Sequence, residues 1–105
     1  MDFNDLASRL GIDNEDFKEL VELFVTTSLS DIEKIRKGVS ENIPTDAAAA
    51  SHSIKGAAGN LGFDDIFSLA RDMEIQAKKG GLENFNGYII DLENKVNALN
   101  LSISK

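Results

Sequence analysis

The sequence predicts an all-α fold, namely an antiparallel up-and-down four-helix bundle with a short extra helix at the N-terminus. Apolar residues recur every three or four positions along most of the chain, which is the period of an amphipathic helix. No segment shows the alternation of apolar and polar residues that a half-buried strand requires. The 105 residues include one proline and are 42% hydrophobic, so a single domain spanning residues 1–105 around one core is expected.

Capping residues, glycines and the proline predict where the first two helices begin and end. A short helix covers residues 2–10 and stops at Gly11. A long helix follows a cap at Asp13 or Asn14, continues to about residue 41, and is broken at Pro44. The apolar positions expected to face the core along this long helix are Phe17, Leu20, Val21, Phe24, Val25, Ile32, Ile35 and Val39.

Three more helices are predicted in the second half of the chain. They cover residues 47–60, with a cap at Thr45 or Asp46, then residues 64–79 and residues 82–102. Four amphipathic helices joined by short connections pack most simply as an antiparallel bundle. The short first helix is expected to lie across one end of it.

Charge and cysteine content exclude several function classes. The formal net charge is −7, so neither a nucleic-acid partner nor an anionic membrane is expected. The chain has no cysteine and one histidine, which excludes disulfides and thiolate metal sites and leaves no metal-binding constellation. The sequence shows neither a signal-peptide pattern nor a membrane span. A cytoplasmic protein is therefore predicted, and we expect it to be a monomer.

His52, the only histidine, is predicted to point to solvent from the third helix. Successive residues of a helix are about 100° apart, which places small or apolar side chains on the side opposite His52. Lys55, Gly56, Gly59 and Ala48 lie within about 60° of His52 and form its exposed stripe. A lone surface histidine is usually only a solvated residue, so the rest of the stripe decides the interpretation.

Three features of this stripe favour a functional role. Gly56 and Gly59 each cost a helix interior up to about 1 kcal/mol relative to alanine, and close approach by a partner is one reason to keep them. Lys55 is three residues after His52, so its ammonium can reach a group attached to the imidazole. Lys55 is also the only charged residue between Ala47 and Phe63. These features suit a phosphoryl group on a nucleophilic imidazole.

Residues 52–62 resemble the motif of histidine-containing phosphotransfer (HPt) domains. They read His-Ser-Ile-Lys-Gly-Ala-Ala-Gly-Asn-Leu-Gly, and the family's motif is His, two residues, Lys-Gly, small residues, then an apolar residue and Gly. The pair Met73-Glu74 and the later Gly80 also resemble the family's next helix. The predicted helical layout agrees with that family over essentially the whole chain.

The resemblance implies a role for each residue of the stripe. His52 would accept and donate the phosphoryl group, and Lys55 would help to balance its charge. Gly56 and Gly59 would give a partner access to the imidazole, with Ala48 on the same partner-binding surface.

The resemblance also implies a phosphocarrier of two-component signalling rather than an enzyme. It would accept a phosphoryl group from the aspartate of one response-regulator receiver domain and pass it to another, with a hybrid sensor kinase as a further partner. The chain would bind no cofactor, because Mg²⁺ belongs to the receiver domain. Autophosphorylation from ATP is not expected.

Alternative interpretations stay open at this point. The phosphoacceptor domain of a sensor kinase usually has an acidic residue directly after the histidine, where this chain has Ser53. A second alternative is a non-catalytic helical interaction module, or an inhibitor, that docks on receiver domains without phosphotransfer. The third is an excised terminal domain of a hybrid kinase; Met1 and the short first helix favour a standalone protein weakly.

Overall fold

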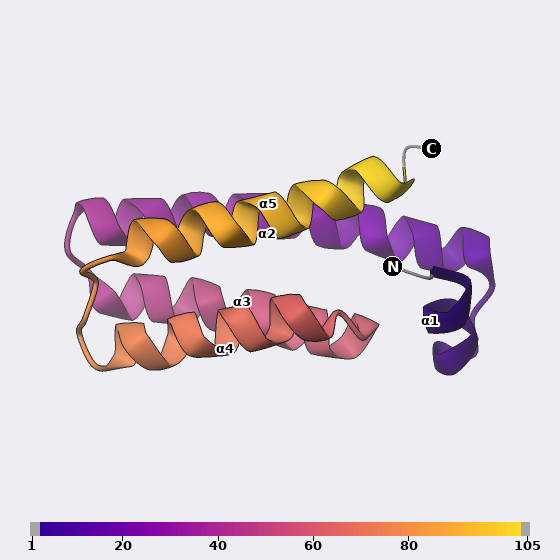
Figure 1. The fold of residues 1–105 in the computed structure, drawn as a ribbon, viewed down its shortest axis with the longest axis horizontal. Coiled ribbons are helices and arrows are strands. Elements are labelled where there is room, and N and C mark those ends of the chain that lie inside the picture. The colour runs from indigo at the N-terminus through magenta and orange to yellow at the C-terminus, as the bar shows by residue number, and fades with distance from the viewer. Residues whose placement is uncertain (1–2, 104–105) are drawn as a thin grey trace.

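A computed structural model describes residues 3–103 (Figure 1). All of the regular secondary structure in this range is helical. The described residues contain no strand, so the all-α prediction is confirmed. The helices are α1 (Phe3–Leu10), α2 (Asn14–Ser40), α3 (Pro44–Leu61), α4 (Asp64–Lys78) and α5 (Phe85–Ile103).

The four longer helices lie along one another, and the chain reverses direction at each connection (Figure 1). Helix α3 packs against both α4 and α2, and α5 runs along α2. The resulting molecule is elongated, with extents of 42 × 22 × 17 Å. Helix α1 lies at one end against α2, and the side chain of Leu6 reaches the connection between α3 and α4, beside Gly62. The predicted first helix began at residue 2, which lies outside the described residues.

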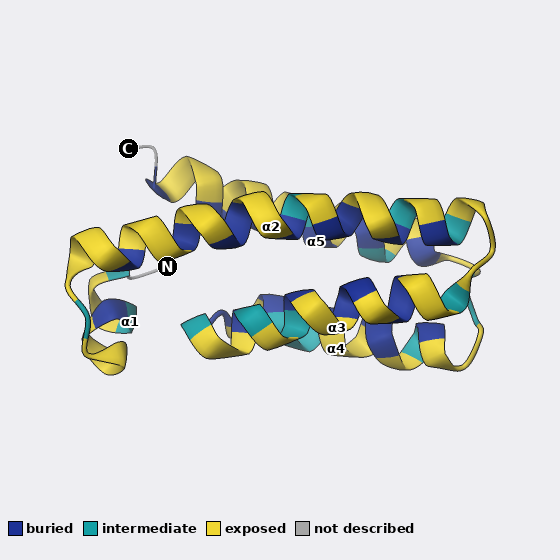
Figure 2. Cartoon of the chain, turned by 180° about the vertical axis from the view of Figure 1, so that it is seen from behind, coloured by how far each residue is buried: buried dark blue, intermediate teal, exposed yellow. Residues whose placement is uncertain are grey.

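Buried residues face inward from each of the long helices (Figure 2). Three phenylalanines join α2 to the connection between α3 and α4: the ring centroids of Phe63 lie 5.2 Å from Phe24 and 6.4 Å from Phe17. Phe63 is fully buried, and burying such a side chain stabilises the fold by about 1.5–3 kcal/mol. This contact fixes the end of α3, the helix that carries His52.

Two predicted helix starts differ from the structure. Helix α3 begins at Pro44 instead of residue 47, because proline at the first helical position is already set at a helical φ and lacks only an N–H that has no helical partner there. Thr45 and Asp46 therefore lie inside α3. Helix α5 begins at Phe85 instead of residue 82, since Asn84 adopts a φ of +67° in the preceding turn. The cap predicted for α2 is confirmed: the backbone N–H of Asp16 donates to the carboxylate of Asp13 at 2.8 Å.

Two glycines allow backbones to meet around α3. A Cβ on Gly38 of α2 would lie 3.1 Å from the backbone nitrogen of Ala47, so this position holds α2 close to the start of α3. Gly62 ends α3 with a φ of +82°, the left-handed conformation that glycine adopts at little cost. The prediction of Gly62 as the stop is confirmed.

One residue predicted for the core is not there. Leu20 of α2 keeps 41% of its surface exposed. The reason is that α3 ends at Leu61, which lines the same surface pocket as Leu20, so no further turn of α3 covers it. Within residues 3–103, no helix combines the length and apolar character needed to cross a membrane.

Candidate functional site

Helix α3 presents the imidazole of His52 to solvent from its middle. The His52 side chain is 65% exposed, whereas Ser51 and Ile54, which face the core from the same turn of α3, are buried. The hydroxyl of Ser51 donates to the backbone carbonyl of Ala47 at 2.8 Å, which satisfies that buried hydroxyl within the helix. The structure therefore places His52 on the solvent side of α3, as the sequence predicts.

A buried glutamate on the neighbouring helix contacts one imidazole and two ammonium groups. The Glu74 side chain, on α4, is 6% exposed. Its Oε2 lies 2.9 Å from Nδ1 of His52 and 3.1 Å from Nζ of Lys78, and its Oε1 lies 2.6 Å from Nζ of Lys55. We call these four residues the Glu74 cluster.

Glu74 is ionised at neutral pH despite its burial. The hydrogen bond from Lys55 has the largest effect on the pKa of Glu74 and lowers it. Burial raises the pKa, whereas Lys78 and His52 lower it further. Together they lower the pKa of Glu74 from 4.5 to about 2. The ammonium groups thus compensate for removing this carboxylate from water, which would otherwise be costly.

An ionised Glu74 determines which nitrogen of the neutral His52 ring carries the proton. A carboxylate can only accept a hydrogen bond, so Nδ1 must be the N–H donor across the 2.9 Å contact. The lone pair of the neutral ring then lies on Nε2. The pair therefore orients the ring and leaves Nε2 as its nucleophilic nitrogen.

The Glu74 cluster carries a positive charge in an acidic chain. One carboxylate offsets one of the two ammonium groups of Lys55 and Lys78, so with a neutral imidazole the cluster has a formal charge of +1, against −7 for the whole chain. An anionic group attached to Nε2 would meet this local positive charge.

The stripe predicted around His52 is partly different in the structure. Gly56 is exposed, and a Cβ placed there would have no atom within 4 Å. Gly59 is also exposed, but a Cβ there would lie 3.2 Å from the ring of Phe67, so α4 approaches this position closely. The placement of Ala48 on the exposed stripe is wrong: it is 7% exposed, because α4 packs along that side of α3.

The position of Lys55 is also corrected by the structure. Its side chain is only 25% exposed, and its ammonium binds Glu74 rather than standing free beside the imidazole. Sequence reasoning gave no role to Glu74 or Lys78. The signal available was weak: Glu74 belongs to the pair that resembles the family's next helix, and Lys78 follows it by one helical turn.

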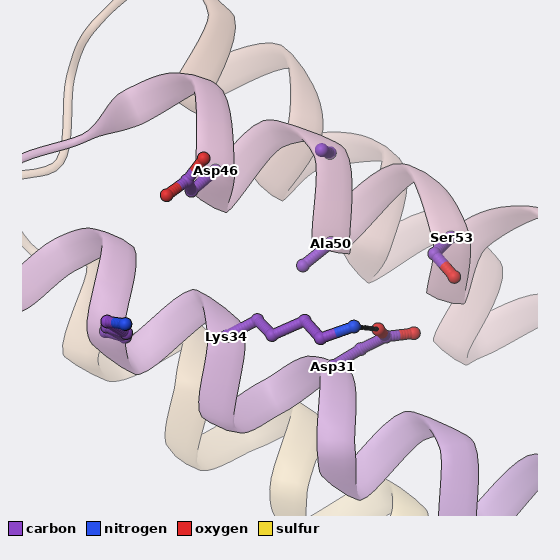
Figure 3. A pocket seen from close by; sticks show the side chains of 7 residues that line it. Asp31, Lys34, Asp46, Ala50 and Ser53 are labelled. Atoms are coloured by element: carbon purple, nitrogen blue, oxygen red, sulfur yellow. Dashed lines mark ion pairs between the residues drawn. The ribbon is translucent and has the colours of Figure 1, made fainter.

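A separate cleft of about 390 Å³ lies between α2 and α3. Figure 3 shows Asp46, Ala50 and Ser53 of α3 facing Asp31 and Lys34 of α2, whose charged groups lie 3.7 Å apart. Ser53 follows His52 in the chain, but the Glu74 cluster is on the opposite flank of α3, toward α4. Among the residues that the structure describes, no three His, Cys, Asp or Glu side chains are grouped as metal ligands.

Comparison with protein families agrees with this geometry. A family model described as "Hpt domain" matches residues 19–101, which include all four residues of the Glu74 cluster. Neither the curated proteins nor the solved structures compared with the chain give a match. Because the family model covers most of the sequence, including the exposed histidine and the lysine beside it, the chain belongs to the Hpt domain family, the histidine phosphotransfer domains of phosphorelay signalling.

Proposed function

We propose that the chain accepts a phosphoryl group on Nε2 of His52 from the aspartate of one receiver domain and passes it to the aspartate of another. The observation that carries this proposal is the 2.9 Å contact between Nδ1 of His52 and the buried Glu74, on a ring that is 65% exposed. The contact defines the tautomer of the ring, and the exposure of the ring lets a second protein reach it. Helices α2 to α5 serve as an antiparallel up-and-down bundle that holds both residues.

The transfer step requires no proton to leave His52. The Nε2 lone pair attacks phosphorus, the N–P bond forms, and the bond between phosphorus and the aspartyl oxygen breaks. The aspartate leaves as a carboxylate, and Nδ1 keeps its hydrogen. The ring therefore gains one positive charge, which the Glu74 carboxylate stabilises across the hydrogen bond. The reverse step releases the phosphoryl group to the next receiver by the same route.

The two lysines offset the charge that the phosphoryl group brings. Lys55 and Lys78 lie on the two oxygens of Glu74, on the same flank of α3 as the imidazole. An incoming dianionic group is stabilised by ammonium groups that are already positioned, so little reorganisation is needed. Lys55 comes from the motif around His52, and Lys78 adds a second ammonium from α4.

The metal and the nucleotide belong to the partners in this scheme. Mg²⁺ in the receiver domain supplies charge neutralisation at its own aspartate. The chain acts as a phosphocarrier rather than as an enzyme, without a cofactor of its own and without autophosphorylation from ATP. We further propose that residues 1–105 act as one cytoplasmic, monomeric domain, with receiver domains and a hybrid sensor kinase as partners.

A transfer assay tests the proposal directly. Incubation with a ³²P-labelled receiver domain and Mg²⁺ is expected to label this chain, and the label is expected to be acid-labile and base-stable. The variant His52→Gln should keep the helical circular-dichroism signal and take no label. A folded His52→Gln protein that is labelled as the wild type would refute the assignment. A wild-type chain that binds receivers but never takes label would identify a non-catalytic interaction module or inhibitor instead.

A further inference from the structure

Asp31 of α2 is a buried acid that the proposed phosphotransfer does not use. Its side chain is 8% exposed, close to the 6% of Glu74, and these two are the buried acids of residues 3–103. Glu74 has three partners within 3.1 Å, whereas the partner of Asp31 in the same part of the chain is Nζ of Lys34, 3.7 Å from Oδ1. Hydrogen bonds from nitrogen to oxygen span about 2.7–3.2 Å, so the carboxylate of Asp31 lacks a donor.

The carboxylate of Asp31 borders the cleft between α2 and α3 (Figure 3). The volume of this cleft is about 390 Å³, which lies within the range of about 300–1,000 Å³ that is usual for small-molecule sites. The two helices run in opposite directions, and a Cβ on Gly38 would lie 3.4 Å from that of Asp46. Asp46 therefore lies at the end of the cleft near Lys37, and Ser53 lies at the end near Asp31. These two ends are about 9 Å apart along α2, at about 1.5 Å per residue.

Opposite charges are present toward both ends of the cleft. Asp31 and Lys34 form the pair at one end, and Asp46 and Lys37 supply one charge of each sign toward the other. The formal charges of these four residues add to zero. The side chains of Lys34 and Lys37 are 69% and 77% exposed, so both ammonium groups are free to turn toward a ligand. A ligand without net charge therefore suits the cleft best.

A ligand that supplies a donor to Asp31 must also provide an anion for Lys34. A simple amine would bind Asp31 but leave the ammonium of Lys34 beside a second cation. A free amino acid avoids this conflict, because its ammonium group can donate to Asp31 while its carboxylate accepts from Lys34. Its side chain would then pass the methyl group of Ala50 toward Asp46 and Lys37. An amide there can donate to the acid and accept from the lysine.

We propose that this cleft is a binding site for a free amino acid with a polar side chain, and that L-glutamine has the matching groups. Lys37 follows Lys34 by about 4.5 Å along α2, which is close to the length of an extended glutamine side chain. The site uses no residue of the Glu74 cluster. It is thus a function beyond phosphotransfer, and binding at it requires neither a receiver domain nor phosphorylation of His52.

An NMR titration of the ¹⁵N-labelled chain with L-glutamine tests the proposal. Saturable shifts are expected at residues 31–37 and 46–53. N-acetyl-L-glutamine lacks the ammonium group and butylamine lacks the carboxylate, so each should bind more weakly on the order of tenfold, the effect of losing one charged hydrogen bond. The variant Asp31→Asn should weaken glutamine binding to a similar extent. The matched control Asp72→Asn changes an exposed acid of α4 and should bind glutamine as the wild type does.

Other outcomes would overturn the proposal. These are the absence of saturable shifts with L-glutamine, shifts centred outside the cleft, and equal glutamine binding by Asp31→Asn and the wild type. If butylamine binds as tightly as glutamine, the cleft is a cation site and the assignment to an amino acid is wrong. If Asp31→Asn does not fold, Lys34→Met, at a side chain that is 69% exposed, takes its place. It should weaken glutamine binding on the order of tenfold, and unchanged binding would contradict the proposal.

Discussion

Nδ1 of His52 lies 2.9 Å from Oε2 of Glu74, although the two residues are 22 positions apart and belong to different helices. The same carboxylate binds the ammonium groups of Lys55 and Lys78. One buried acid therefore orients the imidazole, keeps Nε2 unprotonated in the neutral ring, and gathers positive charge beside it. The predictions below follow from this arrangement.

The first prediction concerns the charge of Glu74. In Glu74→Gln the amide can accept or donate, so it no longer enforces the Nδ1–H tautomer and cannot stabilise a positively charged ring. Loss of a charge-assisted hydrogen bond of about 2 kcal/mol should slow transfer on the order of thirtyfold. Imidazole ¹⁵N shifts report the tautomer, and receiver assays report the rate. Glu83→Gln, at an exposed acid, is the control. An unchanged tautomer together with an unchanged rate would remove Glu74 from the mechanism.

The second prediction is a pH dependence of stability. The pKa of Glu74 is about 2 in the folded chain and ordinarily 4.5. Because the pKa of Glu74 is lower in the folded chain than in the unfolded chain, the ionised carboxylate stabilises the fold. This stabilisation is complete above pH 4.5 and is lost as the pH falls toward 2. A shift of this size corresponds to about 3 kcal/mol. The free energy of unfolding of the wild type, measured with denaturant, should therefore fall by about that much more over this pH range than the free energy of unfolding of Glu74→Gln. Parallel curves for the two proteins would contradict the paired carboxylate.

The third prediction concerns Lys55. Its side chain is 25% exposed and bound to Glu74, so Lys55→Ala should both destabilise the fold, by about 2 kcal/mol, and shorten the lifetime of phosphorylated His52. Thermal melts and the decay of the phosphorylated protein measure the two effects. The control Lys79→Ala changes an exposed lysine next to Lys78 and should alter neither. A stable Lys55→Ala protein with a normal phosphohistidine lifetime would mean that the pairing of Lys55 with Glu74 contributes neither to stability nor to balancing the phosphoryl charge.

The fourth prediction contrasts Gly56 with Gly59. A Cβ on Gly56 meets nothing, so Gly56→Ala should stabilise the free protein by up to about 1 kcal/mol, and Gly56→Leu should fold yet obstruct the receiver. A Cβ on Gly59 would lie 3.2 Å from Phe67, so Gly59→Leu should lower the melting temperature. Thermal melts and transfer rates on the same variants check both. An unfolded Gly56→Leu protein would show that Gly56 serves packing instead of docking.

The fold could be predicted largely because its signals are local. The period of apolar residues, the cap at Asp13 and the left-handed stop at Gly62 all act within a few residues of the chain. The sequence does not reveal the helix start at Pro44, because the possible caps Thr45 and Asp46 compete with proline's preference for the first turn.

The site could be predicted only where α3 alone determines it. Its wheel places His52 and Gly56 correctly on the solvent side. It could not show that Ala48 and much of Lys55 are covered, because that depends on where α4 packs. The same packing brings Glu74 and Lys78 to the imidazole, and no spacing in the sequence reveals a contact between residues so far apart.

The most direct test of the account is the identity of the phosphorylated nitrogen. After transfer from a receiver domain, NMR of the ¹⁵N-labelled chain should show phosphorus coupled to Nε2 of His52, with a hydrogen still on Nδ1 and bonded to Glu74. Phosphorus coupled to Nδ1 would require the contact with Glu74 to break, and phosphorylation of any other residue would leave His52 without its role. Either result would contradict the account.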